Sequence, residues 1–83
     1  MTQSAREFIL AALTSHGPLH GYRIREMSLS ARVEGHAPPS ASAIYGALRR
    51  MERHKEVVVA RVERQGNFPP RTIYSLRQPD DES

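Results

Sequence analysis

The spacing of apolar residues changes once along this chain, after His54, and that change constrains the fold more than any other feature. Before it, apolar residues recur three and four positions apart in three segments, as in helices with one buried face. After it, residues 56–64 (EVVVARVER) are rich in β-branched side chains and residues 71–77 (RTIYSLR) alternate, which is typical of strands. The sequence therefore predicts three helices followed by two strands.

The first two helices are delimited by a serine, a Gly-Pro pair and a proline-containing connector. Ser4 can cap a helix through residues 6–16 (REFILAALTSH), and Gly17-Pro18 ends it. A second helix is expected over residues 20–32, before the connector 34–39 (EGHAPP), whose prolines exclude helix. The residues expected to face the core are Phe8, Ile9, Ala12 and Leu13 in the first helix, and Tyr22, Ile24, Met27 and Ala31 in the second.

The third helix is predicted from Ser40 to His54 and leads directly into the strands. Its buried stripe is expected to consist of Ile44, Ala47, Leu48 and Met51. Residues 65–70 (QGNFPP) predict a loop of about six residues between two antiparallel strands. Three short helices and a hairpin form a winged helix-turn-helix, so the predicted fold class is mainly α with a small β-hairpin. In such folds the helix before the hairpin commonly enters the major groove of DNA.

Length and charge favour a single basic domain. With 83 residues the chain is expected to form one winged-helix domain over residues 1–78, followed by a flexible acidic tail over residues 79–83. The formal net charge is +3, and Lys55 is the only lysine among 12 basic residues. Arginine suits planar recognition of phosphate and guanine, although a GC-rich genome would produce the same bias. A basic body is compatible with nucleic acid as a partner.

No motif indicates catalysis or metal binding. The chain has no cysteine, and its four histidines include His16 and His20, which Gly17-Pro18 keeps off a common helix face. It has no nucleophile elbow, phosphate loop or paired carboxylates. It also lacks a signal-peptide pattern and the roughly 20 apolar residues of a membrane span. We therefore expect a cytoplasmic protein that is not an enzyme and binds no metal or other cofactor and no membrane.

The third helix and the hairpin loop carry the candidate DNA contacts. Small residues near the helix start would let its backbone approach base edges, and arginines could bind phosphate or guanine. We expect Ala43, Gly46, Arg50 and Arg53 to face outward, with Ser42, Tyr45 and Arg49 on the flank. The candidate DNA-binding residues are Ser40, Ser42, Ala43, Tyr45, Gly46, Arg49, Arg50 and Arg53 in the helix, and Arg64, Asn67 and Arg71 in the wing.

Each of these candidates also has a structural interpretation. Tyr45 could pack at the edge of the core, Arg53 could pair with a nearby acid, and the wing arginines could be ordinary surface charge. We expect a structural role for His20 at the start of the second helix. We also expect Tyr22 to pack against the third helix, with a contact to backbone phosphate from this helix start as the alternative.

Three segments resemble the PadR-like family of transcriptional regulators. Residues 17–24 (GPLHGYRI) resemble its G-x-L-H-G-Y-E-I run, and residues 40–52 (SASAIYGALRRME) resemble its S-P-G-S-L-Y-P-A-L-R-R-L-E motif. Residues 69–76 (PPRTIYSL) resemble its G-R-P-R-K-Y-Y-R-L strand. The resemblance implies a winged-helix regulator, usually a repressor, that binds double-stranded DNA at a palindromic operator as a homodimer. An effector site near the dimer interface is implied for the family and stays open here.

The chain departs from the family pattern in places that bear on these expectations. It resembles a short form without the C-terminal dimerisation helix, so dimerisation is expected through the first helix and the domain edges. Lys55 stands where the family usually has glycine, so the third helix is expected to end without a left-handed residue. Pro69 replaces a wing residue that is often arginine. The sequence also fits a winged-helix interaction module, an antagonist or adaptor of another regulator with little DNA binding of its own.

Overall fold

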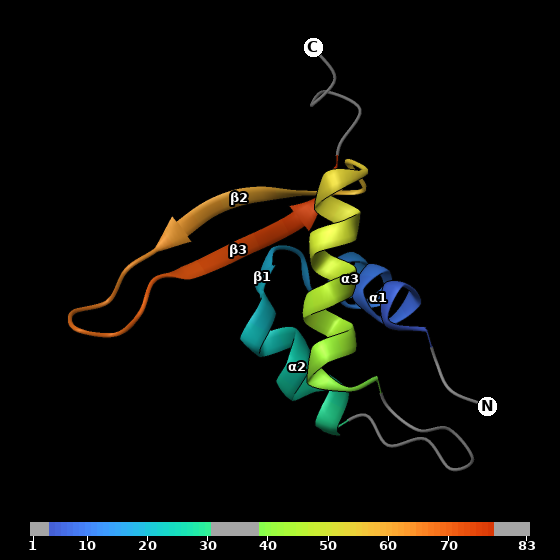
Figure 1. Ribbon diagram of the computed structural model, residues 1–83. Helices are drawn as coiled ribbons and strands as arrows, with labels where there is room; N and C mark the ends of the chain where they lie inside the picture. Colours follow the sequence, from blue (N-terminus) through green and yellow to red (C-terminus); the bar gives the residue numbers. More distant parts are fainter. Residues whose placement is uncertain (1–3, 31–38, 78–83) are drawn as a thin grey trace.

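A computed structural model describes residues 4–30 and 39–77 as three helices and a three-stranded sheet (Figure 1). The elements are, in chain order, α1 (Ala5–His16), β1 (Leu19–His20), α2 (Gly21–Ser30), α3 (Ala41–Arg53), β2 (Val57–Glu63) and β3 (Arg71–Leu76). The helices pack together, and the β2–β3 hairpin extends away from them as a wing (Figure 1). The predicted winged helix is therefore confirmed.

Serine caps begin α1 and α3, as the sequence predicts. The Ser4 hydroxyl accepts a hydrogen bond from the Glu7 N–H at 3.3 Å, and the Ser40 hydroxyl accepts one from the Ala43 N–H at 3.1 Å. Each bond satisfies a backbone donor that a helix leaves unpaired in its first turn. Gly17, with φ of +77°, ends α1. The Ser40 cap thereby fixes the start of the helix that carries most candidate DNA contacts.

The end of α3 corrects one expectation, because Lys55 does take a left-handed conformation, with φ of 62°. The Lys55 N–H donates to the Glu52 carbonyl at 3.0 Å, and the Glu56 N–H donates to the Met51 carbonyl at 2.8 Å. These two bonds form a Schellman motif, the ending that usually places glycine at the left-handed position. The chain turns from α3 into β2 at this motif, so β2 can begin at Val57.

The core forms where the three helices meet the base of the sheet. The predicted stripes of α1 and α3 are confirmed as buried. In α2, Ile24 is buried and Met27 is half-buried, but Tyr22 is 49% exposed and does not belong to the core stripe. The buried positions near the start and end of α2 are Gly21 and Ser28. The buried stripe of α2 passes through Gly21, Ile24 and Ser28, and Tyr22 is about 100° round the helix from Gly21, so the prediction for Tyr22 was wrong.

The sheet has the order β1–β3–β2, and all its pairings are antiparallel. The two-residue strand β1, which the sequence did not predict, pairs His20 with Ile73. In the hairpin the register shifts between Val59 and Arg61, so Ala60 forms a bulge. Every residue from Val59 to Arg71 is exposed, so this part of the wing is free to meet a partner.

Three predicted features lie wholly or partly outside the described residues. These are the end of the second helix with Ala31, residues 34–38 of the connector, and the acidic tail at residues 79–83.

Candidate nucleic-acid interface

The outward face of α3 presents polar and cationic side chains along the whole helix. The exposed candidates are Ser42, Tyr45, Arg49, Arg50 and Arg53, together with the capping residue Ser40. Ala43 and Gly46 are half-buried, so they face outward less fully than we expected. The buried stripe lies on the opposite side of the helix. The face therefore combines small residues near its N-terminal end with three arginines in its C-terminal half.

The Arg50 side chain lies along the helix beside Gly46. A Cβ atom added at Gly46 would lie 3.4 Å from the Arg50 Nη1 atom. The Arg50 guanidinium therefore reaches back by one turn, toward the small residues at the start of α3. A helix with this surface can bring its backbone close to the bases in a groove. The Arg50 guanidinium can then donate two hydrogen bonds to one base or phosphate.

Tyr45 meets both interpretations that the sequence leaves open. A Cβ atom added at Gly21 would lie 2.9 Å from the Tyr45 Cε1 atom, so the ring packs over the start of α2. The side chain is nevertheless 36% exposed. Tyr45 is thus an edge-of-core residue that still has surface available to a partner. No pattern in the sequence indicated that Gly21 is the residue that makes room for the Tyr45 ring.

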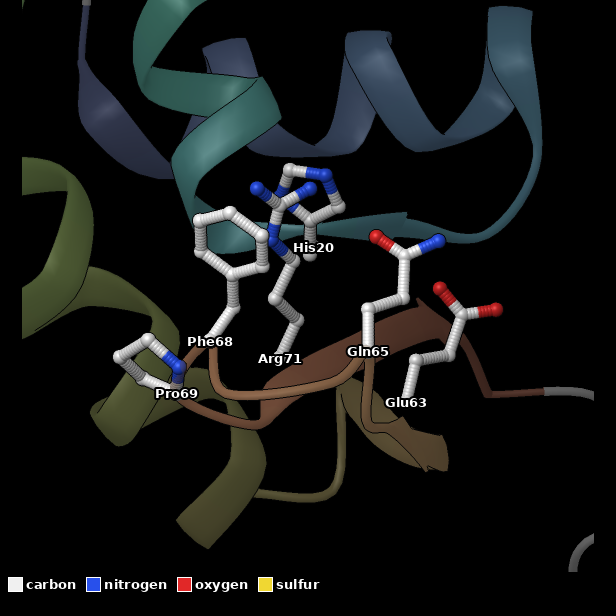
Figure 2. Close-up of a pocket in the computed structure, with 6 residues that line it drawn as sticks. All are labelled: His20, Glu63, Gln65, Phe68, Pro69 and Arg71. Atoms are coloured by element: carbon white, nitrogen blue, oxygen red, sulfur yellow. The ribbon is translucent and has the colours of Figure 1, made fainter.

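Two adjoining hollows separate the wing from α2 and α3, and we call them together the wing crevice. The larger, of about 240 Å³, is lined by His20, Gly21, Tyr22, Tyr45 and the hairpin segment from Pro70 through Thr72, with Tyr74. The smaller, of about 90 Å³, is lined by His20, Glu63, Gln65, Phe68, Pro69 and Arg71 (Figure 2). His20 and Arg71 line both hollows. The crevice therefore runs from Tyr45 on α3 to Phe68 in the wing loop.

His20 is the cap of α2, which confirms the structural role expected for it. Its Nδ1 atom accepts a hydrogen bond from the Arg23 N–H at 3.0 Å. The Tyr22 ring stacks on the imidazole, with the two ring centres 6.3 Å apart, and remains exposed outside the core. In Figure 2 the side chains of Gln65, Phe68 and Arg71 extend from the hairpin toward the strand that carries His20.

The wing carries an excess of positive charge next to this crevice. The Arg61 Nε atom lies 3.0 Å from the Glu63 Oε2 atom. Glu63 is also directly opposite Arg71 in the β2–β3 register. Within residues 4–30 and 39–77, Arg64 and Arg71 form no ion pair. One carboxylate therefore lies among three arginines, and the predicted wing residues Arg64, Asn67 and Arg71 are all exposed.

Tyr74 forms part of the crevice wall and keeps its hydroxyl proton. Partial burial raises the pKa of Tyr74, the charge of Glu52 raises it further, and Arg49 opposes the shift. The phenol is therefore neutral at physiological pH and can donate a hydrogen bond to an anion. Sequence reasoning did not select this residue, because strand alternation alone does not tell which partner a side chain meets.

The same described residues offer no group of three histidine or acidic side chains arranged to hold a metal ion. Within that part of the chain, no helix is long and apolar enough to cross a membrane.

A family model settles the relationship that these features suggest. The model of the transcriptional regulator PadR-like family matches residues 9–78. This chain belongs to the PadR-like family. The family is one of transcriptional regulators, which agrees with the expectation that the chain is not an enzyme. No curated protein matches it.

Two solved structures share the fold of this PadR-like chain. The structure of Bacillus subtilis PadR in complex with operator DNA has a TM-score of 0.72 and 22% sequence identity. The match covers 96% of this chain and 43% of that chain. Pex from Synechococcus sp. strain PCC 7942 has a TM-score of 0.67 and 19% identity, over 99% of this chain and 73% of Pex. This PadR-like chain thus spans less than half the length of the PadR chain.

Proposed function

We propose that this PadR-like chain is a sequence-specific double-stranded DNA-binding repressor of transcription. In this proposal α3 reads the major groove, and the wing contacts the backbone or the minor groove. The wing crevice carries the proposal, because it joins the arginine-bearing face of α3, through Tyr45, to the cationic wing, through Arg71. The fold shared with a PadR that was solved in complex with operator DNA supports it. A regulator of this kind acts where the DNA is, so we place it in the cytoplasm.

The two arms of the surface would have different tasks. On α3, the small side chains Ser42, Ala43 and Gly46 permit close approach, and Arg50 can reach a guanine or a phosphate. In the wing, Arg64, Asn67 and Arg71 suit the narrow minor groove or the phosphates beside it. Base contacts from α3 would therefore set the sequence preference, and wing contacts would set the register on the duplex.

A homodimer would let two copies of α3 read a palindromic operator. Half-sites would then lie about one helical turn, roughly 34–36 Å, apart. We propose that the dimer forms through α1 and the edges of the domain. The mass of the protein in solution, measured alone and with operator, tests this point. A single chain bound to a non-palindromic site would contradict it.

Replacing Arg50 by alanine is the sharpest test of the role of α3. We expect Arg50→Ala to weaken binding about tenfold or more to a duplex that the wild-type protein has selected from a randomised pool. If its partner is a phosphate, the slope of log K against log salt should also become shallower by about 0.9. Arg25→Ala on α2 removes the same charge outside this face and is the matched control.

Two outcomes would decide against the proposal. Tight binding by Arg50→Ala, with an unchanged salt slope and an unchanged sequence preference, would remove α3 as the reading element. Absence of salt-dependent binding by the wild-type protein to any duplex would instead favour the alternative, an interaction module that acts on another regulator.

A further inference from the structure

We propose that the wing crevice seats one phosphate of the DNA backbone, held by the His20 imidazole and the Arg71 guanidinium. This inference rests on the proposed DNA-binding function. In a duplex, each backbone strand separates a major groove from a minor groove. A protein with α3 in one groove and the wing in the next must therefore accommodate a strand between them. The wing crevice lies between these two elements, and both of its hollows are bounded by His20 and Arg71.

The capping bond of α2 determines which donor His20 can offer. Since Nδ1 accepts the Arg23 N–H, that nitrogen carries no proton. The imidazole that makes this bond is therefore the neutral tautomer with its proton on Nε2. His20 also lines the crevice, and in the proposed complex its Nε2–H group donates to the phosphate. One side chain thus orders the helix start and presents a hydrogen-bond donor at the same place.

Arg71 supplies the charge for a phosphate, because the carboxylate next to it is already engaged. Glu63 lines the smaller hollow and lies opposite Arg71 in the sheet, but its Oε2 atom contacts Arg61 at 3.0 Å. Arg71 has no ion-pair partner in the described ranges. A phosphate in the crevice would meet a guanidinium with free N–H groups, beside a carboxylate whose charge Arg61 partly offsets. Charge-assisted bonds of this type are the stronger class of hydrogen bond.

The rest of the crevice suits the sugar-phosphate backbone beside the seated phosphate. The Phe68 ring is 70% exposed at the wing end, where it can pack against a deoxyribose. It is held by the turn in which the Phe68 N–H donates to the Gln65 carbonyl at 3.0 Å, and Pro69 and Pro70 follow. Tyr74 contributes a protonated hydroxyl at the α3 end. The two prolines after the turn restrict the backbone that carries the ring, so less backbone order must be gained on binding.

Two substitutions of His20 separate its two roles. Asparagine is a favoured N-cap and can accept the Arg23 N–H, but it lacks the Nε2–H donor. We expect His20→Asn to keep the wild-type melting temperature and to bind the selected duplex about threefold to tenfold more weakly. Its salt slope should equal that of wild type, because a neutral donor releases no counterion. His20→Ala should lose the same affinity and also melt at a lower temperature.

Arg71→Gln and backbone-modified DNA identify the phosphate itself. We expect Arg71→Gln to reduce the salt slope by about 0.9, the value for one phosphate contact on duplex DNA. A series of duplexes, each with one phosphate replaced by an uncharged methylphosphonate, should contain a position that weakens the wild-type protein. That same position should weaken binding by Arg71→Gln and by His20→Asn less than it weakens binding by the wild-type protein. Inorganic phosphate at matched ionic strength should not compete, since a seat for backbone needs the flanking sugars.

The outcomes of these measurements distinguish this inference from the function on which it rests. If the wild-type protein binds DNA and both variants bind with wild-type affinity and slope, the phosphate seat is wrong and the proposed function stands. The same conclusion follows if no methylphosphonate position has a smaller effect on Arg71→Gln than on the wild-type protein. If the wild-type protein binds no duplex, the seat and the proposed function both fall.

Discussion

Lys55 has an unusual backbone conformation at the end of α3. Among the described residues, the positive φ angles belong to Lys55, Gly17 and Gly66. A side chain with a Cβ atom makes the left-handed conformation less stable by about 1–2 kcal/mol. The two hydrogen bonds of the Schellman motif hold Lys55 in this conformation, and β2 begins two residues later, at Val57. The helix thus ends in the motif that usually takes glycine, with a lysine at the left-handed position.

Replacing Lys55 by glycine should therefore stabilise the domain. We expect Lys55→Gly to raise the free energy of unfolding by about 0.5–1 kcal/mol. Glycine removes the strain of the positive φ angle, and this gain exceeds the free-energy cost of ordering a more flexible unfolded chain. Urea denaturation followed by circular dichroism measures this change. Lys55→Ala is the matched control, because it removes the charge but keeps the Cβ atom. An equal gain in Lys55→Ala would assign the effect to charge instead of conformation.

At the scale of the elements, a buried hydroxyl connects α2 to the segment that begins α3. Ser28 is 1% exposed, and its hydroxyl donates to the Pro39 carbonyl at 3.0 Å. Pro39 directly precedes the capping residue Ser40. The bond therefore fixes the entry to α3 relative to α2. Sequence periodicity could not reveal it, because a serine inside a helix reads as a surface residue until its partner is known.

Removing that hydroxyl should weaken the docking of the two helices. We expect Ser28→Ala to lower the free energy of unfolding by about 1–2 kcal/mol, because it leaves the buried Pro39 carbonyl without its donor. The melting temperature by differential scanning calorimetry reports the loss. Ser30→Ala, an exposed position on the same helix, should change it little. Equal effects of the two substitutions would point to helix propensity as the cause.

On the scale of the whole molecule, an ion pair joins the first helix to the turn between α3 and β2. The Arg6 Nε atom donates to the Glu56 Oε1 atom at 2.8 Å, across 50 positions of sequence. The hydrogen bond from Arg6 lowers the pKa of Glu56, and the same bond raises the pKa of Arg6. Because the folded carboxyl holds its proton less tightly than the unfolded one, the pair stabilises the fold above the ordinary pKa of glutamate. That contribution is lost as the pH falls through the lowered pKa.

Stability at acidic pH should therefore depend on Arg6. We expect Arg6→Gln to make the fall in melting temperature between neutral and acidic pH less steep than in wild type. The difference should be small and should shrink at high salt, because the pair is exposed. Melting temperatures over a pH series at two salt concentrations measure it. Arg23→Gln, an exposed arginine on α2, should keep the wild-type pH dependence. A parallel shift in both variants would show that net charge, not this pair, is responsible.

Local periodicity and capping were enough to predict several features of this fold. The stripes of α1 and α3, the serine caps and the two strands of the wing all follow from apolar spacing and from the conformations open to serine, glycine and proline. The arginines of α3 were predicted to face outward because they lie on the side of the helix opposite its buried stripe. These features need no knowledge of distant residues, because each is set by neighbours a few positions away.

Other features depend on pairing between distant segments, and they could be found only in the folded chain. The strand β1 exists because β3 lies beside it, and Tyr22 is exposed because Gly21 occupies the place against Tyr45. The wing crevice, which brings His20 next to Arg71, likewise joins residues about 50 positions apart. Two-residue strands and side-chain partners leave no periodic trace in a sequence, so the fold alone placed them.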